Sequence, residues 1–134
     1  MNEIEVLIID EHAAVCHALA SRLNAVASIR VVGATCDLGE GLCLAKLAQP
    51  DIVLLELKWR DRIGSRQRER DPHRAISQLL AAGPWSIIIL TSYLDEVEKD
   101  SAMAAGAKRY LLKDIDTGRL VTEIEDVINE TLSV

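Results

Sequence analysis

Phenylalanine is absent from this sequence, and two tryptophans and two tyrosines are its only large aromatic residues. A hydrophobic core must therefore be built from Ile, Leu, Val and Ala. Apolar residues still make up 49% of the chain and charged residues 27%, which is ordinary for a globular protein. The 134 residues are enough for one domain with a sizeable core and too few for two. We expect a single domain over residues 1–134.

Motifs of metal binding, secretion and membrane insertion are also missing. Cys16, Cys36 and Cys43 form no CxxC pair and have no zinc spacing with a histidine, so they are interpreted as small apolar residues in a reduced compartment. The first residues, MNEIE, are acidic where a signal peptide would be basic. No apolar run approaches the ~20 residues of a membrane span. We expect a cytoplasmic protein without membrane contact.

Positive charge is scarce as well. Fifteen Lys and Arg stand against 21 Asp and Glu, which gives a net charge of −6. Because phosphate attraction needs a basic face, this balance argues against the whole domain binding nucleic acid, although it leaves room for a local basic patch.

Short β-branched runs alternate with segments of helical spacing along the chain. In the first helical segment Val15, Ala18, Leu19 and Leu23 share one face. Strands are predicted at residues 4–9, 29–34, 51–57, 86–91 and 109–112, and helices from Val15, over 38–48, 73–82 and 94–105, and around 120–128. Five strands separated by helices predict an α/β fold, a doubly wound parallel sheet with helices on both faces. In such sheets the ligand site lies beyond the carboxyl ends of the strands.

Polar residues stand at four of these strand ends. Asp10 and Glu11 follow the first strand, Glu56 lies in the third, Thr91 ends the fourth and Lys113 follows the fifth. Crowded carboxylates with a lysine and a hydroxyl suit a hard divalent ion, Mg²⁺ above all, and the charged oxygens of a phosphoryl group. The sequence therefore predicts one shared pocket at this edge of the sheet.

Each residue has a plainer interpretation when it is taken alone. Asp10 could cap the first helix, and Ser92 fits the capping-box pattern of the helix that follows. Lys113 could be a solvated lysine at a strand end. Glu56 is harder to dismiss, because it lies among leucines that look buried, where an unpaired carboxylate is costly.

Four stretches resemble response-regulator receiver domains, the CheY-like superfamily: VLIIDEH at 6–12, PDIVLLEL at 50–57, IIILTSY at 87–93 and GAKRYLLKD at 106–114. The last resembles receivers that precede a LuxR/NarL-type DNA-binding domain. The resemblance implies the flavodoxin-like (βα)5 fold with strand order 2-1-3-4-5. By position it implies the following roles: Mg²⁺ binding by Asp10, Glu11, Glu56 and the carbonyl of Lys58, phospho-acceptor at Glu56, switch residues Thr91 and Tyr110, and phosphoryl contact by Lys113.

The phospho-acceptor of the family is aspartate, and this chain has Glu56 instead. The extra methylene adds a bond of about 1.5 Å, and a misplacement of ~1 Å can cost ~100-fold in rate. We therefore expect a poor acceptor whose charge reaches towards Thr91 and Lys113 and biases the domain to an active-like state. Two lengthened carboxylates, Glu11 and Glu56, also leave less room for Mg²⁺. A direct Lys113–Glu56 ion pair is the alternative occupant of that space.

The segment after the third strand is longer than is usual in the family, and it is basic. Residues 58–74 hold seven Lys and Arg against three acids. They form either a solvated loop or a surface for docking an anion or a partner, with these candidate residues: Trp59, Arg60, Arg62, Arg66 and Arg68.

The function predicted is a switch in phosphorelay signalling, not an enzyme. By resemblance its partners are a sensor histidine kinase and a second copy of the chain. Acids and cations could pair across such a dimer, although surface charges of this kind are usually solvated: Glu96, Asp100 and Glu123 against Lys108, Arg109 and Arg119. DNA would be bound only through an output domain outside this chain. The alternative is a pseudo-receiver, an interaction module that is never phosphorylated.

Overall fold

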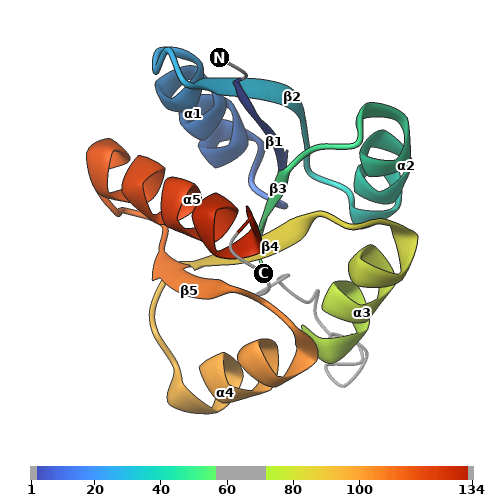
Figure 1. The fold of residues 1–134 in the computed structure, drawn as a ribbon. Coiled ribbons are helices and arrows are strands. Elements are labelled where there is room, and N and C mark those ends of the chain that lie inside the picture. Colours follow the sequence, from blue (N-terminus) through green and yellow to red (C-terminus); the bar gives the residue numbers. More distant parts are fainter. Residues whose placement is uncertain (1–2, 57–71, 133–134) are drawn as a thin grey trace.

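The computed structural model describes residues 3–56 and 72–132. Five strands alternate with five helices along the described chain (Figure 1). The strands are β1 (Ile4–Ile9), β2 (Ile29–Thr35), β3 (Ile52–Leu55), β4 (Ser86–Thr91) and β5 (Arg109–Leu112). The helices are α1 (Ala13–Asn24), α2 (Leu38–Ala48), α3 (Pro72–Ala82), α4 (Glu96–Ala105) and α5 (Thr117–Leu132).

The strands form one parallel sheet in the order β2-β1-β3-β4-β5. The predicted fold class and strand order are therefore confirmed. The order reverses at β1, so β1 and β3 are the two neighbouring strands whose connections leave in opposite directions. A ligand crevice is expected beyond their carboxyl ends.

Helices cover both faces of the sheet, with α1 and α5 on one side and α2, α3 and α4 on the other (Figure 1). Because side chains alternate along a strand, each buried strand supplies both layers. In β1, for example, Leu7 and Ile9 pack towards α2 and α3, whereas Val6 and Ile8 pack towards α1 and α5. The central strands are consequently apolar on both faces.

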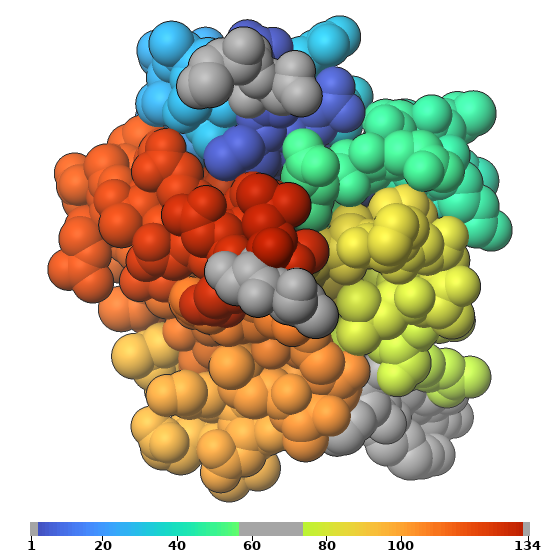
Figure 2. Space-filling view, in the orientation of Figure 1, coloured from blue at the N-terminus to red at the C-terminus, as the bar shows by residue number. Residues whose placement is uncertain are grey.

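The last helix completes the first of these layers. Leu120, Ile124 and Val127 of α5 are fully buried against it. Figure 2 shows α5 lying against the N-terminal elements, with α2 and α3 packed side by side on the other side of the molecule. No helix within residues 3–56 and 72–132 is long and apolar enough to cross a membrane.

Some local predictions were wrong. In α1 the buried residues are Cys16, Leu19 and Leu23, whereas Val15 and Ala18 are exposed. Leu19 and Leu23 are buried as predicted, but Cys16 takes the buried place expected for Val15, and its thiol lies against the Thr35 carbonyl at the end of β2.

The start of α4 also differs from the prediction. Asp95 caps the helix, since its Oδ1 accepts hydrogen bonds from the backbone N–H groups of Val97 and Glu98 at 2.9 and 3.1 Å. Ser92 is therefore not the N-cap, and the helix starts two residues later than expected.

Candidate functional site

Backbone hydrogen bonds between neighbouring strands align the residues at the carboxyl edge of the sheet. Glu56 follows β3 directly and donates its N–H to the carbonyl of Ile9, the last residue of β1, at 3.0 Å. Lys113 follows β5 and donates its N–H to the carbonyl of Thr91 at 2.8 Å. Asp10 is the residue after Ile9. Three segments distant in the sequence therefore deliver their polar side chains to one edge.

The ammonium of Lys113 joins two of the predicted carboxylates. Its Nζ lies 2.9 Å from Asp10 Oδ2 and 3.4 Å from Glu56 Oε2. Asp10 is 3% exposed and Glu56 2%, so the pairs lie in the interior, where water screens them little. The other oxygen of Asp10, Oδ1, accepts the backbone N–H of His12 at 2.8 Å, just before α1. Of the five side chains expected in one pocket, those of Asp10, Glu56 and Lys113 are in direct contact.

Glu56 is only partly satisfied in this pocket. Burial raises its pKa to about 7, opposed by the ammonium of Lys113 and assisted by the nearby carboxylate of Asp10. Among the described residues, its Oε1 is a buried side-chain atom without a hydrogen-bond partner. Near neutral pH a substantial fraction of the protein therefore carries a neutral carboxylic acid at position 56.

Within the part of the chain that the structure describes, the side chains at this edge do not fit a divalent cation as they lie. Across residues 3–56 and 72–132, no three His, Cys, Asp or Glu side chains are grouped to hold a metal ion. The Lys113 ammonium lies between the carboxylates of Asp10 and Glu56, where it supplies the neutralising charge. Glu11 lies beside them with its side chain 16% exposed, and its Oε2 is 3.8 Å from His12 Nε2. The alternative ion pair of Lys113 with Glu56 is thus the arrangement observed.

The two predicted switch residues direct their hydroxyl groups towards the segment that leads into α4 and the first turn of that helix. Thr91 is fully buried and its hydroxyl donates to the carbonyl of Tyr93 at 3.1 Å. Tyr110 is 7% exposed, and its hydroxyl donates to Glu98 Oε1 at 2.5 Å and accepts the Asp95 N–H at 3.2 Å. Burial and the hydrogen bond to Glu98 raise the pKa of the Tyr110 hydroxyl. Tyr110 is consequently held inward against the start of α4.

Sequence reasoning missed two partners and misplaced one contact. His12 and Glu98 were not singled out, and nothing in their spacing marks them, because each is defined by a contact that folding creates. The side chain of Glu56 was expected to reach towards both Thr91 and Lys113, and an interaction is found with Lys113. The remaining candidates lie outside the described residues: Lys58, Trp59, Arg60, Arg62, Arg66 and Arg68.

One cation considered for a dimer contact is used within the chain. Arg109 Nε lies 2.8 Å from Glu123 Oε1, and its Nη2 lies 2.5 Å from Glu130 Oε2. These bonds tie β5 to α5, so Arg109 is already paired with acids of its own chain.

Comparison with known proteins agrees with the geometry. The family model of the response regulator receiver domain matches residues 6–125. The chain therefore belongs to the response regulator receiver domain family.

Two curated relatives are transcriptional regulators. The chain is 36% identical over 110 residues to the transcriptional regulatory protein LiaR of Bacillus subtilis, covering 82% of this chain and 49% of LiaR. It is 29% identical over 125 residues to the DNA-binding transcriptional activator DevR/DosR of Mycobacterium tuberculosis, covering 92% of this chain and 54% of the relative. The chain thus spans about half the length of these relatives.

A solved structure supports the fold independently. The receiver domain of the response regulator NarL from Mycobacterium tuberculosis superimposes with a TM-score of 0.79 over 95% of this chain and 97% of that one, at 22% identity. This likeness concerns the fold alone.

Proposed function

We propose that this receiver domain signals without a phosphoryl group on Glu56. The observation that carries the proposal is the Lys113 ammonium, which lies 2.9 Å from Asp10 and 3.4 Å from Glu56 in a pocket where both carboxyl groups are almost fully buried. The lysine that would contact an incoming phosphoryl group is engaged by the acceptor side chain itself.

The chemistry of Glu56 supports the same conclusion. A carboxyl group attacks phosphorus through its ionised oxygen, and burial raises the pKa of Glu56 to about 7, so its nucleophilic form is depleted at neutral pH. The longer side chain also displaces the reacting oxygen from the position an aspartate would give it, and near-attack geometry tolerates little displacement. Both effects lower the rate of phosphoryl transfer.

Lys113 supplies one positive charge to the carboxylates at this edge of the sheet, which lowers their demand for a cation. Mg²⁺ binding is general in receiver domains, but here the ion would have to displace the ammonium and separate two established ion pairs. We infer that Mg²⁺ binds weakly or not at all to the wild-type chain.

The output surface would then be set by the inward position of Tyr110. Its hydrogen bonds to Glu98 and Asp95 fix the start of α4 relative to β5, and this helix and strand form the surface that partners would read. By its relation to transcriptional regulators, the domain would act in the cytoplasm as a homodimer and reach DNA through an output domain outside this chain.

A phosphorylated switch is the second candidate, in which a sensor histidine kinase donates the phosphoryl group. The placement of Asp10, Thr91 and Lys113 at the same strand ends favours it, because these are residue types that hold a phosphoryl group. This candidate requires Lys113 to leave Glu56 when the phosphoryl group arrives.

Beryllofluoride, a phosphoryl mimic, separates the two candidates. Wild-type protein and the Glu56→Asp variant would be titrated with Mg²⁺ and beryllofluoride while backbone amide NMR spectra are recorded. The proposal predicts an unchanged wild-type spectrum and shifted resonances in the variant around Thr91 and Tyr110. Saturable wild-type shifts at these residues would favour the phosphorylated switch and overturn the proposal.

A further inference from the structure

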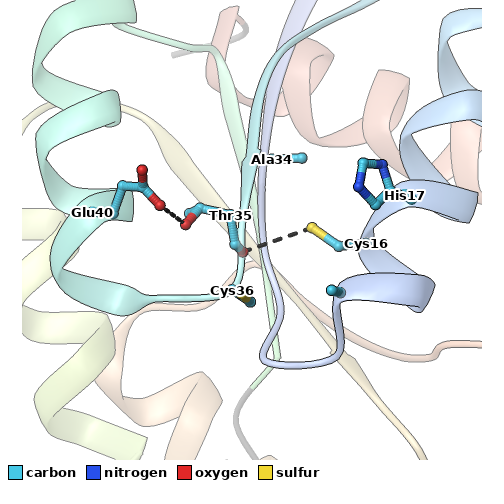
Figure 3. A pocket seen from close by; sticks show the side chains of 7 residues that line it. Cys16, His17, Ala34, Thr35, Cys36 and Glu40 are labelled. Carbon is cyan, nitrogen blue, oxygen red and sulfur yellow. Dashed lines mark hydrogen bonds between the residues drawn. The ribbon is translucent and has the colours of Figure 1, made fainter.

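A hollow lies between α1 and the end of β2, next to the segment that carries Asp10. It is a cavity of about 180 Å³ between the start of α1 and the end of β2 (Figure 3). Two of the three cysteines of the chain, Cys16 and Cys36, line it together with His17 and Ala34. All three cysteines are free thiols.

The backbone brings the two thiols into one neighbourhood. Cys16 is 4% exposed, and its Sγ lies 3.7 Å from the carbonyl oxygen of Thr35, to which it donates a weak hydrogen bond (Figure 3). That carbonyl belongs to the peptide that links Thr35 to Cys36. Standard peptide dimensions put the Cys36 Cα roughly 2.8 Å from the same oxygen. The Cys16 sulfur therefore lies against the peptide group that joins Thr35 to Cys36.

Cys36 is the residue directly after β2, and it lines the same cavity as Cys16 of α1. The Thr35 hydroxyl contacts Glu40 of α2, on one face of the sheet. Ala34 and Cys36, on either side of Thr35, line the cavity with Cys16, and Thr35 and Glu40 also contribute to its lining. Cys36 is exposed to solvent at this point, whereas Cys16 is enclosed.

We propose that Cys16 and Cys36 are a modification site that peroxide converts to an intramolecular disulfide. Peroxide oxidises the exposed Cys36 thiol to a sulfenic acid and is itself reduced to water. The Cys16 sulfur then attacks the Cys36 sulfur, the S–S bond forms, and the sulfenic oxygen leaves as a second water with the Cys16 proton. A thiol reductant reverses the reaction by exchange.

The order of the two steps follows from exposure. Peroxide reaches the exposed Cys36 thiol directly, and the buried Cys16 thiol then attacks the Cys36 sulfenic acid from the interior side. Burial raises the pKa of the Cys16 thiol, followed in size by the effects of the Asp10 carboxylate and of Cys36, which agrees with Cys16 being the less reactive thiol towards peroxide.

The disulfide would act on the loop that carries the acidic pair. The Thr35 carbonyl accepts the Asp10 N–H at 3.0 Å as well as the Cys16 thiol. A covalent bond between Cys16 and Cys36 would tie the first turns of α1 to the end of β2 on both sides of this carbonyl. Oxidation would therefore fix the segment between β1 and α1, on which Asp10 and Glu11 lie.

The test is peroxide treatment of the full reduced chain, followed by alkylation, intact mass and non-reducing peptide mapping. The expected wild-type product has lost two hydrogen atoms, retains one alkylatable thiol at Cys43, and gives a cross-linked peptide pair containing Cys16 and Cys36. Its yield should not change when the protein is diluted tenfold, because the bond forms within one molecule.

Variants identify the two sulfurs. Cys43→Ser, on exposed α2 surface, should form the bond as the wild type does. Cys36→Ser should form none, and Cys16→Ala should accumulate oxygen on Cys36 instead of the cross-link. The exposed position of Cys36 makes its variant safe for folding, and the wild-type cross-link decides the matter even where Cys16→Ala unfolds. Cross-links through Cys43, concentration-dependent dimers, or wild-type Cys36 that only gains oxygen would overturn the proposal.

Discussion

Replacing Glu56 with glutamine should stabilise the protein above neutral pH and not below pH 5. Burial raises the pKa of Glu56 in the folded state to about 7 from its ordinary 4.5. The folded state then binds the proton more tightly than the unfolded state, so stability is lost as pH rises from 4.5 through 7. At about 1.4 kcal/mol per pKa unit, the full loss is about 3.5 kcal/mol.

Glutamine removes this pH-dependent loss and introduces a new cost. Its amide cannot ionise, but it places N–H donors beside the Lys113 ammonium, and an unsatisfied buried donor costs roughly 1–3 kcal/mol. We therefore expect Glu56→Gln to exceed the wild type in free energy of unfolding by about 1–2 kcal/mol at pH 8, and to lose that advantage at pH 5.

Urea unfolding at half-unit steps between pH 5 and 8.5 measures the difference. Glu125→Gln, an exposed substitution of the same type on α5, is the matched control and should follow the wild-type curve with a small constant offset. Curves of unfolding free energy against pH that run parallel for wild type and Glu56→Gln would refute the reasoning. They would mean that the pKa of Glu56 is the same in the folded and unfolded states.

Three further substitutions test contacts elsewhere in the fold, two at the start of α4 and one in the turn before β4. Tyr110→Phe removes the hydroxyl that contacts Glu98 and the Asp95 N–H, and should cost about 1–2 kcal/mol in urea unfolding; no loss would mean that this hydroxyl does not hold α4. Asp95→Ala removes the cap of α4 and should cost about 1 kcal/mol, with increased amide hydrogen exchange confined to the first turn of that helix. Gly83→Ala would place a Cβ 2.2 Å from the Trp85 ring, so a melting temperature equal to wild type would contradict the described packing.

The sequence was sufficient to predict the parallel sheet and the approach of the polar residues at its strand ends. The apolar runs in β1, β3 and β4 have no polar face, which fits only strands covered by helices on both sides. Once the strands are parallel, Asp10, Glu56 and Lys113 must come to the same edge. Their approach therefore follows from the topology and needs no knowledge of side-chain packing.

What could not be predicted depends on contacts between segments that are distant in the sequence. The face of α1 is decided by Cys16 packing beneath the Thr35 carbonyl, and a pattern count that favours Val15 cannot detect this contact. The start of α4 is likewise fixed by Asp95, whose N–H donates to Tyr110 from β5. Local capping patterns predicted Ser92, because they do not include a tertiary partner.

The partner of the Glu56 carboxyl group also could not be predicted from residue spacing. A carboxylate among leucines indicated burial, but whether Mg²⁺ or Lys113 lies beside it depends on where the Lys113 side chain is placed, which spacing in the sequence does not specify. The structure places the ammonium 2.9 Å from Asp10 and 3.4 Å from Glu56. The closer partner is Asp10, which leaves Glu56 as the carboxyl group that can hold a proton.

Incubation with acetyl phosphate and Mg²⁺, followed by intact mass measurement, tests most directly whether the Lys113–Glu56 ion pair prevents phosphorylation of Glu56. The account predicts no phosphoryl gain on the wild-type chain and a gain of one phosphoryl group on Glu56→Asp, whose shorter side chain restores the ordinary acceptor. A wild-type chain that gains a phosphoryl group mapped to Glu56 would contradict it.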